Sequence, residues 1–202
     1  MECFTTLDAV ACPLGLADVD TDQLIPARFM SRSRVQGYGG YLMHDARFDA
    51  HGIQRQSFIL NDPRYAGARI LVARRNFGTG SSREAAVYAL WDYGIRCVIA
   101  TSFGDIFASN AVKNGLLPAT ISDTDLEQIL ASLGSSQDGK LSVDLVAQTI
   151  GGRFPFDIDP VRRLQLLNGW DDIDITLQRH EAIALYRAQL VVDRAWTFPV
   201  PH

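Results

Sequence analysis

The chain has 202 residues, of which 47% are hydrophobic and 21% charged, and its formal net charge at pH 7 is −4 with a sequence pI of about 5.5. These values are typical of a globular protein with one substantial core. The acidic balance and the lack of a basic cluster argue against nucleic-acid binding, and no apolar run approaches the roughly 20 residues that a membrane span requires.

The cysteines and the first residues bear on the cellular compartment. The three cysteines, Cys3, Cys12 and Cys97, are far apart and odd in number, so the sequence predicts neither a disulfide framework nor a cysteine-based metal site. The N-terminal segment contains Glu2 and Asp8 but no early Lys or Arg, unlike a secretory signal. We therefore expect a cytoplasmic protein, with Cys97 of the apolar run IRCVIA as a core residue.

The region before residue 65 is predicted to be irregular. Pro26 and the glycine cluster at 37–40 argue against long helices there. The Asp-Thr-Asp segment at 20–22 places a threonine between two carboxylates, which is typical of an Asx turn. Spacing alone favours a solvated turn at this position over a functional site.

The pattern becomes regular between residues 69 and 121. It predicts a strand at 69–74, a helix at about 82–93, a strand at 95–100, a helix at about 103–114 and extended structure at 116–121. The strands are continuously apolar rather than alternating, which indicates a buried parallel sheet connected by helices.

Further helices and an antiparallel pair complete the chain. Residues 125–133 predict a short amphipathic helix, and 141–158 alternate as an antiparallel pair would. Asp159 is suited to cap a helix that Gly169 ends, and a last helix is expected at 177–190. The whole chain is predicted to be an α/β protein of one domain.

The histidines give no indication of a metal site. They are His44, His51, His180 and His202, and their spacing matches no pattern such as HExxH. We expect His180 on the surface of a helix and propose no metal ligand in this chain.

The segment NFGTGSSREAA, residues 76–86, joins a predicted strand to a predicted helix. Ser81 and Glu84 fit a capping box, and glycines suit a tight turn before it. The same residues also suit an anion, because helix N-terminal N–H groups, small residues and the guanidinium of Arg83 favour a carboxylate or phosphate. The spacing matches neither the Walker pattern nor a dinucleotide fingerprint. Local chemistry leaves both interpretations open.

Three segments in order resemble the isopropylmalate dehydratase small-subunit family of the aconitase superfamily: VDTDQLIPARF, NFGTGSSREAAVYALWDYGIRCVIATSFGDIFASNAVKNGLLPA and LNGWDDIDITLQRHEAIALY. The resemblance covers about residues 4–190. It implies a swivel domain with three β/β/α layers and a mostly parallel central sheet, spanning 1–202 with a C-terminal helical extension. It also implies a hydro-lyase of leucine biosynthesis that interconverts 2- and 3-isopropylmalate.

The resemblance also implies partners and site residues. A large subunit would carry a [4Fe–4S] cluster, this chain would bind no cofactor, and the ligand would be a small dicarboxylate. The implied catalytic residues are Ser81, as the base, and Asp22. The implied substrate-binding residues are Thr21, Arg28, Gly80, Ser82 and Arg83. The implied specificity loop consists of Phe29, Met30, Ser31 and Arg32.

Helix N-terminal amides and Arg83 would stabilise the ionised oxygen that a serine base requires. Capping and catalysis thus demand the same geometry of Ser81.

Departures from the family pattern leave alternatives open. Thr79 stands where the family commonly has Cys, Ala85 stands where it has His, and Arg32 adds a charge beside apolar Phe29 and Met30. A paralogous hydro-lyase for another dicarboxylate, for example citraconate, methylated maleate or homoaconitate, is therefore a second hypothesis. A non-catalytic anion-binding module is the third.

Overall fold

The computed structural model describes residues 1–136 and 138–197. The chain divides into two compact units, Met1–Gly169 and Trp170–His202. The expectation that 1–202 form one swivel domain with a helical extension stays a prediction, and His202 lies outside the described residues.

Seven strands form one mixed sheet in the order β4-β3-β2-β1-β5-β6-β7. They are β1 (Thr6–Pro13), β2 (Ile70–Val72), β3 (Cys97–Ala100), β4 (Leu117–Thr120), β5 (Lys140–Asp144), β6 (Thr149–Ile150) and β7 (Phe154–Pro155). Strands β1 to β4 are parallel, whereas β5, β6 and β7 continue the sheet in antiparallel fashion.

Strand β1 belongs to both halves of the sheet. Its residues 6–10 pair with β5, and its residues 11–13 pair with β2. This strand was not predicted, because alanine and aspartate weaken its β propensity. Its first half nevertheless alternates, with Leu7 and Ala9 buried and Thr6 and Asp8 exposed.

The eight α-helices of the described residues are α1 (Thr21–Leu24), α2 (His44–Arg47), α3 (Glu84–Tyr93), α4 (Asp105–Lys113), α5 (Asp123–Ser135), α6 (Pro160–Asn168), α7 (Asp172–Leu177) and α8 (His180–Asp193). Short 3-10 helices lie at Ala27–Phe29, Arg34–Gln36, Gly39–Tyr41, Ile59–Asn61, Pro63–Tyr65 and Ala195–Thr197. No helix in the described part of the chain has the length and apolar character needed to cross a bilayer.

The predicted β-α-β-α-β succession is confirmed as β2, α3, β3, α4 and β4, with fully buried residues in β2 and β3. Helix α6 is confirmed with its caps. Asp159 Oδ1 accepts hydrogen bonds from the N–H groups of Val161 and Arg162, each with a length of 3.0 Å, and Gly169 ends the helix. Residues 141–158 were predicted to form two antiparallel strands. The structure has three short antiparallel strands there, β5, β6 and β7. The irregularity predicted before residue 65 holds after β1.

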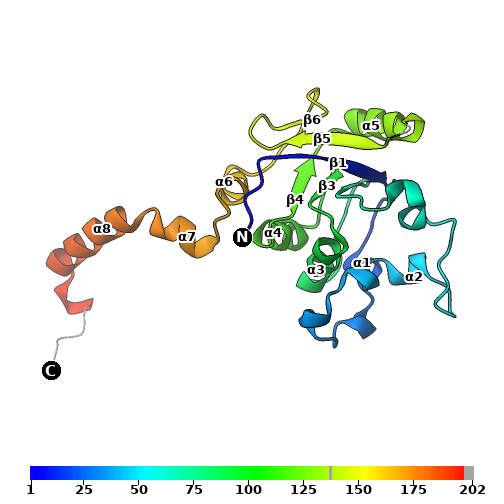
Figure 1. The fold of residues 1–202 in the computed structure, drawn as a ribbon. Helices are drawn as coiled ribbons and strands as arrows, with labels where there is room; N and C mark the ends of the chain where they lie inside the picture. The colour runs from blue at the N-terminus through cyan, green and yellow to red at the C-terminus, as the bar shows by residue number, and fades with distance from the viewer. Residues whose placement is uncertain (137, 198–202) are drawn as a thin grey trace. The chain divides into compact units, whose positions relative to one another are not determined.

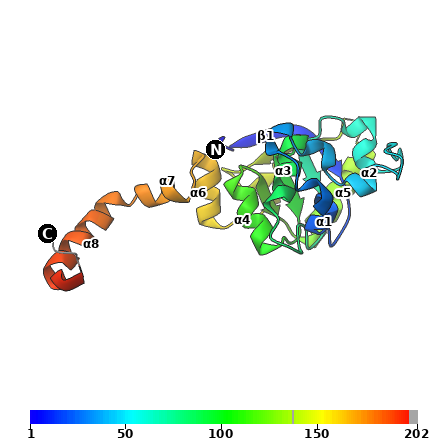
Figure 2. The same cartoon turned by 90° about the horizontal axis from the view of Figure 1, so that it is seen from below.

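Two apolar clusters lie on opposite faces of the parallel strands. One contains Leu24 of α1, Leu90 of α3 and Phe107 of α4. The other contains Ile129 of α5 and Val143 of β5. Figure 1 shows α3 and α4 on one side of the strands and α5 with β5 on the other, and Figure 2 shows α1, α3 and α4 on their common side. The predicted α/β fold with a mostly parallel central sheet is therefore observed.

Candidate functional site

The two polar motifs of the sequence lie side by side. The Gly78 N–H donates to the Val19 carbonyl over 2.7 Å, and the Thr21 N–H donates to the Thr79 carbonyl over 2.9 Å. Asp20 and Thr79 form a parallel bridge at the same place. The second motif follows the carboxyl end of β2, the edge of a parallel sheet at which α/β folds bind ligands. Folding thus joins two segments that are far apart in the sequence.

A buried threonine holds an exposed serine at this junction. Thr21 is 1% exposed, and its Oγ1 donates to the Ser81 carbonyl over 3.1 Å and lies 3.3 Å from the Ser81 Oγ. A Cβ built on Gly80 would lie 3.4 Å from the same Thr21 Oγ1. Because Ser81 is exposed, the hydroxyl pair is open on the serine side. The prediction of a solvated turn is therefore wrong for Thr21.

The predicted capping box of Ser81 and Glu84 is wrong. Helix α3 begins at Glu84, its N-cap residue is Arg83, and no side chain caps it. Glu84 instead accepts a hydrogen bond from Asn114 Nδ2 over 2.9 Å. The Ser81 carbonyl receives the Arg83 N–H over 2.8 Å and the Thr21 hydroxyl, and these bonds keep Ser81 outside the helix. Ser81, exposed Ser82 and Arg83 precede the first turn rather than forming it.

The Asp-Thr-Asp segment contains the capping box that Ser81 lacks. Asp20 Oδ1 accepts from the Gln23 N–H over 2.7 Å, and Gln23 Oε1 accepts from the Asp20 N–H over 3.1 Å. This cap starts α1. Asp22, in the first turn of the helix, points away from the core and is exposed.

An arginine of one motif binds a carboxylate of the other. Arg83 Nη1 donates to Asp22 Oδ1 in an ion pair, with side chains that are 22% and 57% exposed. A guanidinium has five N–H donors, so a second carboxylate can share Arg83 with Asp22. The structure therefore gathers Thr21, Asp22, Gly80, Ser81 and Arg83, with Ser82 between the last two.

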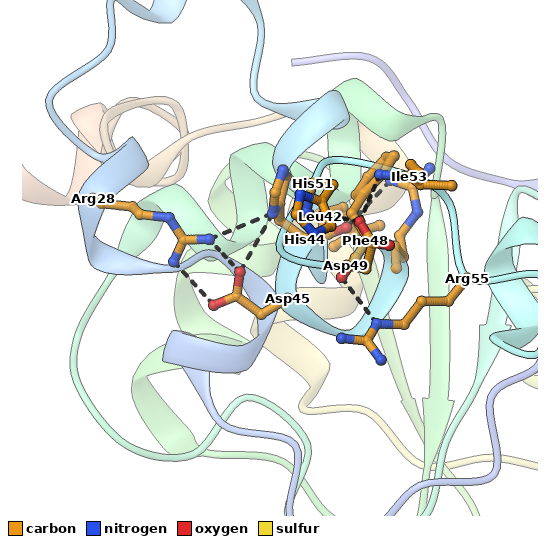
Figure 3. Close-up of polar contacts among 10 residues, drawn as sticks. Arg28, Leu42, His44, Asp45, Phe48, Asp49, His51, Ile53 and Arg55 are labelled. Atoms are coloured by element: carbon orange, nitrogen blue, oxygen red, sulfur yellow. Dashed lines mark hydrogen bonds and ion pairs between the residues drawn. The ribbon is translucent and has the colours of Figure 1, made fainter.

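Arg28 is engaged elsewhere. Its Nη1 donates to Asp45 Oδ2 over 2.9 Å and its Nη2 donates to Asp45 Oδ1, while His44 Nδ1 lies 3.4 Å from Nη2 (Figure 3). The hydrogen bonds raise the pKa of Arg28 and lower the pKa of Asp45. Asp45 also lines an open cavity together with Asp22, so this second arginine–aspartate pair borders the space beside the first.

Sequence reasoning missed Asp45, and no spacing rule connects it to Arg28. The pair forms only because α2 folds back toward the 3-10 helix that carries Arg28. In the sequence, the only indication of a carboxylate partner was the positive charge of Arg28 next to the predicted specificity loop.

The predicted specificity loop is partly packed. Phe29 stacks on Tyr41, with ring centroids 4.3 Å apart and an interplanar angle of 11°. Met30, Ser31 and Arg32 are exposed. The loop thus has one anchored aromatic residue followed by three residues available to a ligand or partner.

The described residues contain no group of three or more His, Cys, Asp or Glu that could hold a metal ion. Cys3 is exposed, whereas Cys12 and Cys97 are buried in β1 and β3, which confirms Cys97 as a core residue. Burial raises the pKa of Cys12 to about 12 and also raises the pKa of Cys97. Thiols of this kind are poor metal ligands, because the thiolate is the binding form.

The turn that presents Ser81 depends on Gly78. Its φ is +74°, and an added Cβ would overlap the ring of Phe107 and lie 2.7 Å from the Phe107 Cβ. We expect Gly78→Ala to lower the free energy of unfolding by about 3 kcal/mol, through left-handed strain and overpacking. Urea unfolding of the full chain measures this loss.

Gly52→Ala is the matched control, because Gly52 has a φ of +77° and no atom within 4 Å of its added Cβ. It isolates the backbone strain, expected at about 1 kcal/mol. Equal losses in the two variants would show that packing against Phe107 does not constrain the turn.

Residues 1–124 match the family described as the aconitase C-terminal domain. The chain is 46% identical to the 3-isopropylmalate dehydratase small subunit of Rhodopseudomonas palustris (strain TIE-1), over 97% of this chain and 100% of the relative. It is also 46% identical to the protein of the same name from Rhodospirillum centenum, over 97% of this chain and 98% of the relative.

One solved structure, 3-isopropylmalate dehydratase from Methanocaldococcus jannaschii, is similar with a TM-score of 0.61 and 24% identity. The likeness covers 90% of this chain and 99% of that chain. At this identity it bears on the fold alone.

Proposed function

This chain belongs to the family of 3-isopropylmalate dehydratase small subunits, and we propose that it is the small subunit of such a hydro-lyase, acting in the cytoplasm in leucine biosynthesis. The reaction interconverts 2- and 3-isopropylmalate by removal and return of water. The observation that carries the proposal is the junction of the two motifs, where the Ser81 hydroxyl meets Thr21 beside the Arg83–Asp22 pair.

Ser81 serves as the base that removes a proton next to a substrate carboxylate. A serine hydroxyl is a weak acid, so its ionised oxygen needs nearby donors. The Thr21 hydroxyl, 3.3 Å away, can turn its proton from the Ser81 carbonyl to the Ser81 Oγ. The uncapped start of α3 and the charge of Arg83 add further stabilisation.

One substrate carboxylate binds to groups that surround Ser81, and the other binds to Arg28. Arg83 already holds the carboxylate of Asp22, and its remaining donors suit a carboxylate of the substrate. Exposed Ser82 and the backbone at Gly80 contribute donors on the open side. Arg28 binds the second carboxylate while Asp45 keeps its guanidinium oriented. Asp22 then shares Arg83 with the substrate and accepts the proton that the Ser81 hydroxyl releases when it ionises to become the base.

A large partner subunit completes the site. Ser81, Ser82 and Asp22 are exposed in this chain, whereas proton abstraction by an alkoxide requires that bulk water be excluded. The described residues do not fit an iron–sulfur cluster, so we place the family's [4Fe–4S] cluster in the large subunit. The small subunit contributes the base and the carboxylate-binding groups.

The choice of substrate rests on the specificity loop. Phe29 and Met30 suit an isopropyl group, whereas the exposed charge of Arg32 suits an additional carboxylate. Arg32 is therefore the observation that favours a paralogous hydro-lyase for citraconate, methylated maleate or homoaconitate as the second candidate.

The experiment combines this chain with a cognate large subunit and follows the absorbance of isopropylmaleate. Turnover of isopropylmalate in preference to the other acids is the expected result. Preferred turnover of another acid would show that this acid, and not isopropylmalate, is the substrate. Carboxylate binding by the isolated chain with no activity in any reconstituted pair would indicate a non-catalytic anion-binding module.

A further inference from the structure

The specificity loop, residues 29–32, is held by a residue outside it. Tyr38 is 6% exposed, and its hydroxyl donates to the Arg32 carbonyl over 2.8 Å and lies 3.4 Å from the Met30 carbonyl. One buried hydroxyl thus contacts two carbonyls of an otherwise exposed loop. Apart from the local turn bonds of the loop, these two hydrogen bonds tie its carbonyls to a residue outside it.

Tyr38 is in turn fixed to the end of α3. Its N–H donates to Asp92 Oδ2 over 2.8 Å, and Arg34 Nη1 donates to the same oxygen over 3.3 Å. Arg34 also lies 3.8 Å from the centroid of the Tyr88 ring. A Cβ on Gly39 would lie 2.6 Å from the Asp92 carbonyl carbon, so backbone meets backbone here. These contacts attach the segment after the loop to the second half of α3.

Aromatic rings extend the same connection to the start of the loop. Phe29 stacks on Tyr41 at 4.3 Å, and the Tyr38 ring lies 6.4 Å from Tyr41 and 6.2 Å from Tyr88. The chain of rings runs from the loop to α3 through buried and half-buried side chains. Both ends of the loop are therefore positioned by the same helix.

Helix α3 begins directly after Ser81, Ser82 and Arg83 and carries Tyr88 and Asp92 farther along. A helix of 10 residues is rigid on this scale, so it fixes the distance between the proposed base and the loop. Resting on the proposed function, we propose that Tyr38 and Asp92 are positioning residues that set substrate selectivity by holding the specificity loop at a fixed place relative to Ser81.

The test is Tyr38→Phe in the complex with the large subunit. It removes one hydroxyl, and a hydrogen bond of about 1 kcal/mol corresponds to about a fivefold change in an equilibrium. We expect the ratio of kcat/KM for 3-isopropylmalate to that for 3-methylmalate to fall about fivefold. The change appears in KM for the larger acid, whose isopropyl group loses contacts with the loosened loop, while kcat stays within about twofold.

Tyr93→Phe is the matched control. The Tyr93 hydroxyl donates to the Leu60 carbonyl over 3.1 Å, which is a comparable bond from α3 that does not involve the loop. A merely structural role for a tyrosine hydroxyl would affect both variants alike, whereas the proposal expects an unchanged selectivity ratio in Tyr93→Phe. Asp92→Ala is expected to lower the ratio in the same direction as Tyr38→Phe.

Limited trypsin digestion of the full chain provides a readout that does not depend on turnover. Cleavage after Arg32 is expected to be severalfold faster in Tyr38→Phe than in the wild type or in Tyr93→Phe. Turnover of isopropylmalate with an unchanged ratio in Tyr38→Phe would overturn the role of Tyr38 alone. Absence of that turnover in the wild-type complex would overturn the proposed function, and with it the selectivity that Tyr38 is proposed to set.

Discussion

Replacing Ser81 with alanine is expected to lower kcat of the reconstituted complex about a thousandfold, as for the loss of a general base. The Thr21 hydroxyl would retain its bond to the carbonyl of residue 81, so the backbone of the junction would keep its shape. Substrate binding would then change little, because the Arg83–Asp22 pair does not involve the serine side chain. Steady-state kinetics with 3-isopropylmalate should show a loss in kcat at nearly constant KM.

The control for this variant is Ser135→Ala. Ser135 is exposed at the end of α5, and its hydroxyl donates only locally, to the Ala131 and Ser132 carbonyls. It is expected to leave kcat unchanged. Undiminished turnover in Ser81→Ala would show that Ser81 is not the base. A raised KM with normal kcat would show that Ser81 binds substrate instead.

The regular half of the fold could be predicted because its signals are local. Continuous apolar runs gave β2 and β3, and Asp159 with Gly169 marked both ends of α6. Strand β1 could not be predicted in the same way. Its residues gain stability by pairing with β2 on one part and β5 on another, and both partners lie far along the chain.

The same distinction applies to the candidate site. The sequence identified Thr21 and Ser81 as parts of two motifs, but spacing indicated a solvated turn and a helix cap. Their actual environment arises from the backbone bonds between Val19–Thr21 and Gly78–Thr79. Burial of Thr21 follows from that contact and not from its neighbours in the sequence. Local rules therefore were wrong about the burial of Thr21 and about the capping role of Ser81, and they missed the bond between the two motifs.

Partners of charged residues were the least predictable part. Arg83 pairs with Asp22, and Arg28 pairs with Asp45, across distances along the chain that no helix or strand periodicity relates. Tyr38 likewise had no signal beyond its place in a glycine-rich segment. These contacts became recognisable only when the fold packed α1 against α2 and α3.

Arg83→Lys is expected to raise KM for 3-isopropylmalate about thirtyfold with a smaller effect on kcat. Lysine keeps the positive charge but lacks the planar fork of N–H donors, so it cannot hold Asp22 and a substrate carboxylate in fixed directions together. Hydrogen bonds to charged groups contribute about 1.5–3 kcal/mol, which sets the expected size of the change. Arg75→Lys is the matched control, because exposed Arg75 pairs with Asp18 over 3.3 Å in the neighbouring segment and has no proposed role. An equal KM in Arg83→Lys and Arg75→Lys would mean that the planar fork of N–H donors of Arg83 does not bind the substrate. The substrate carboxylate would then be held mainly by the partner subunit, and the exposed Arg83–Asp22 pair would serve to join the two motifs around Ser81.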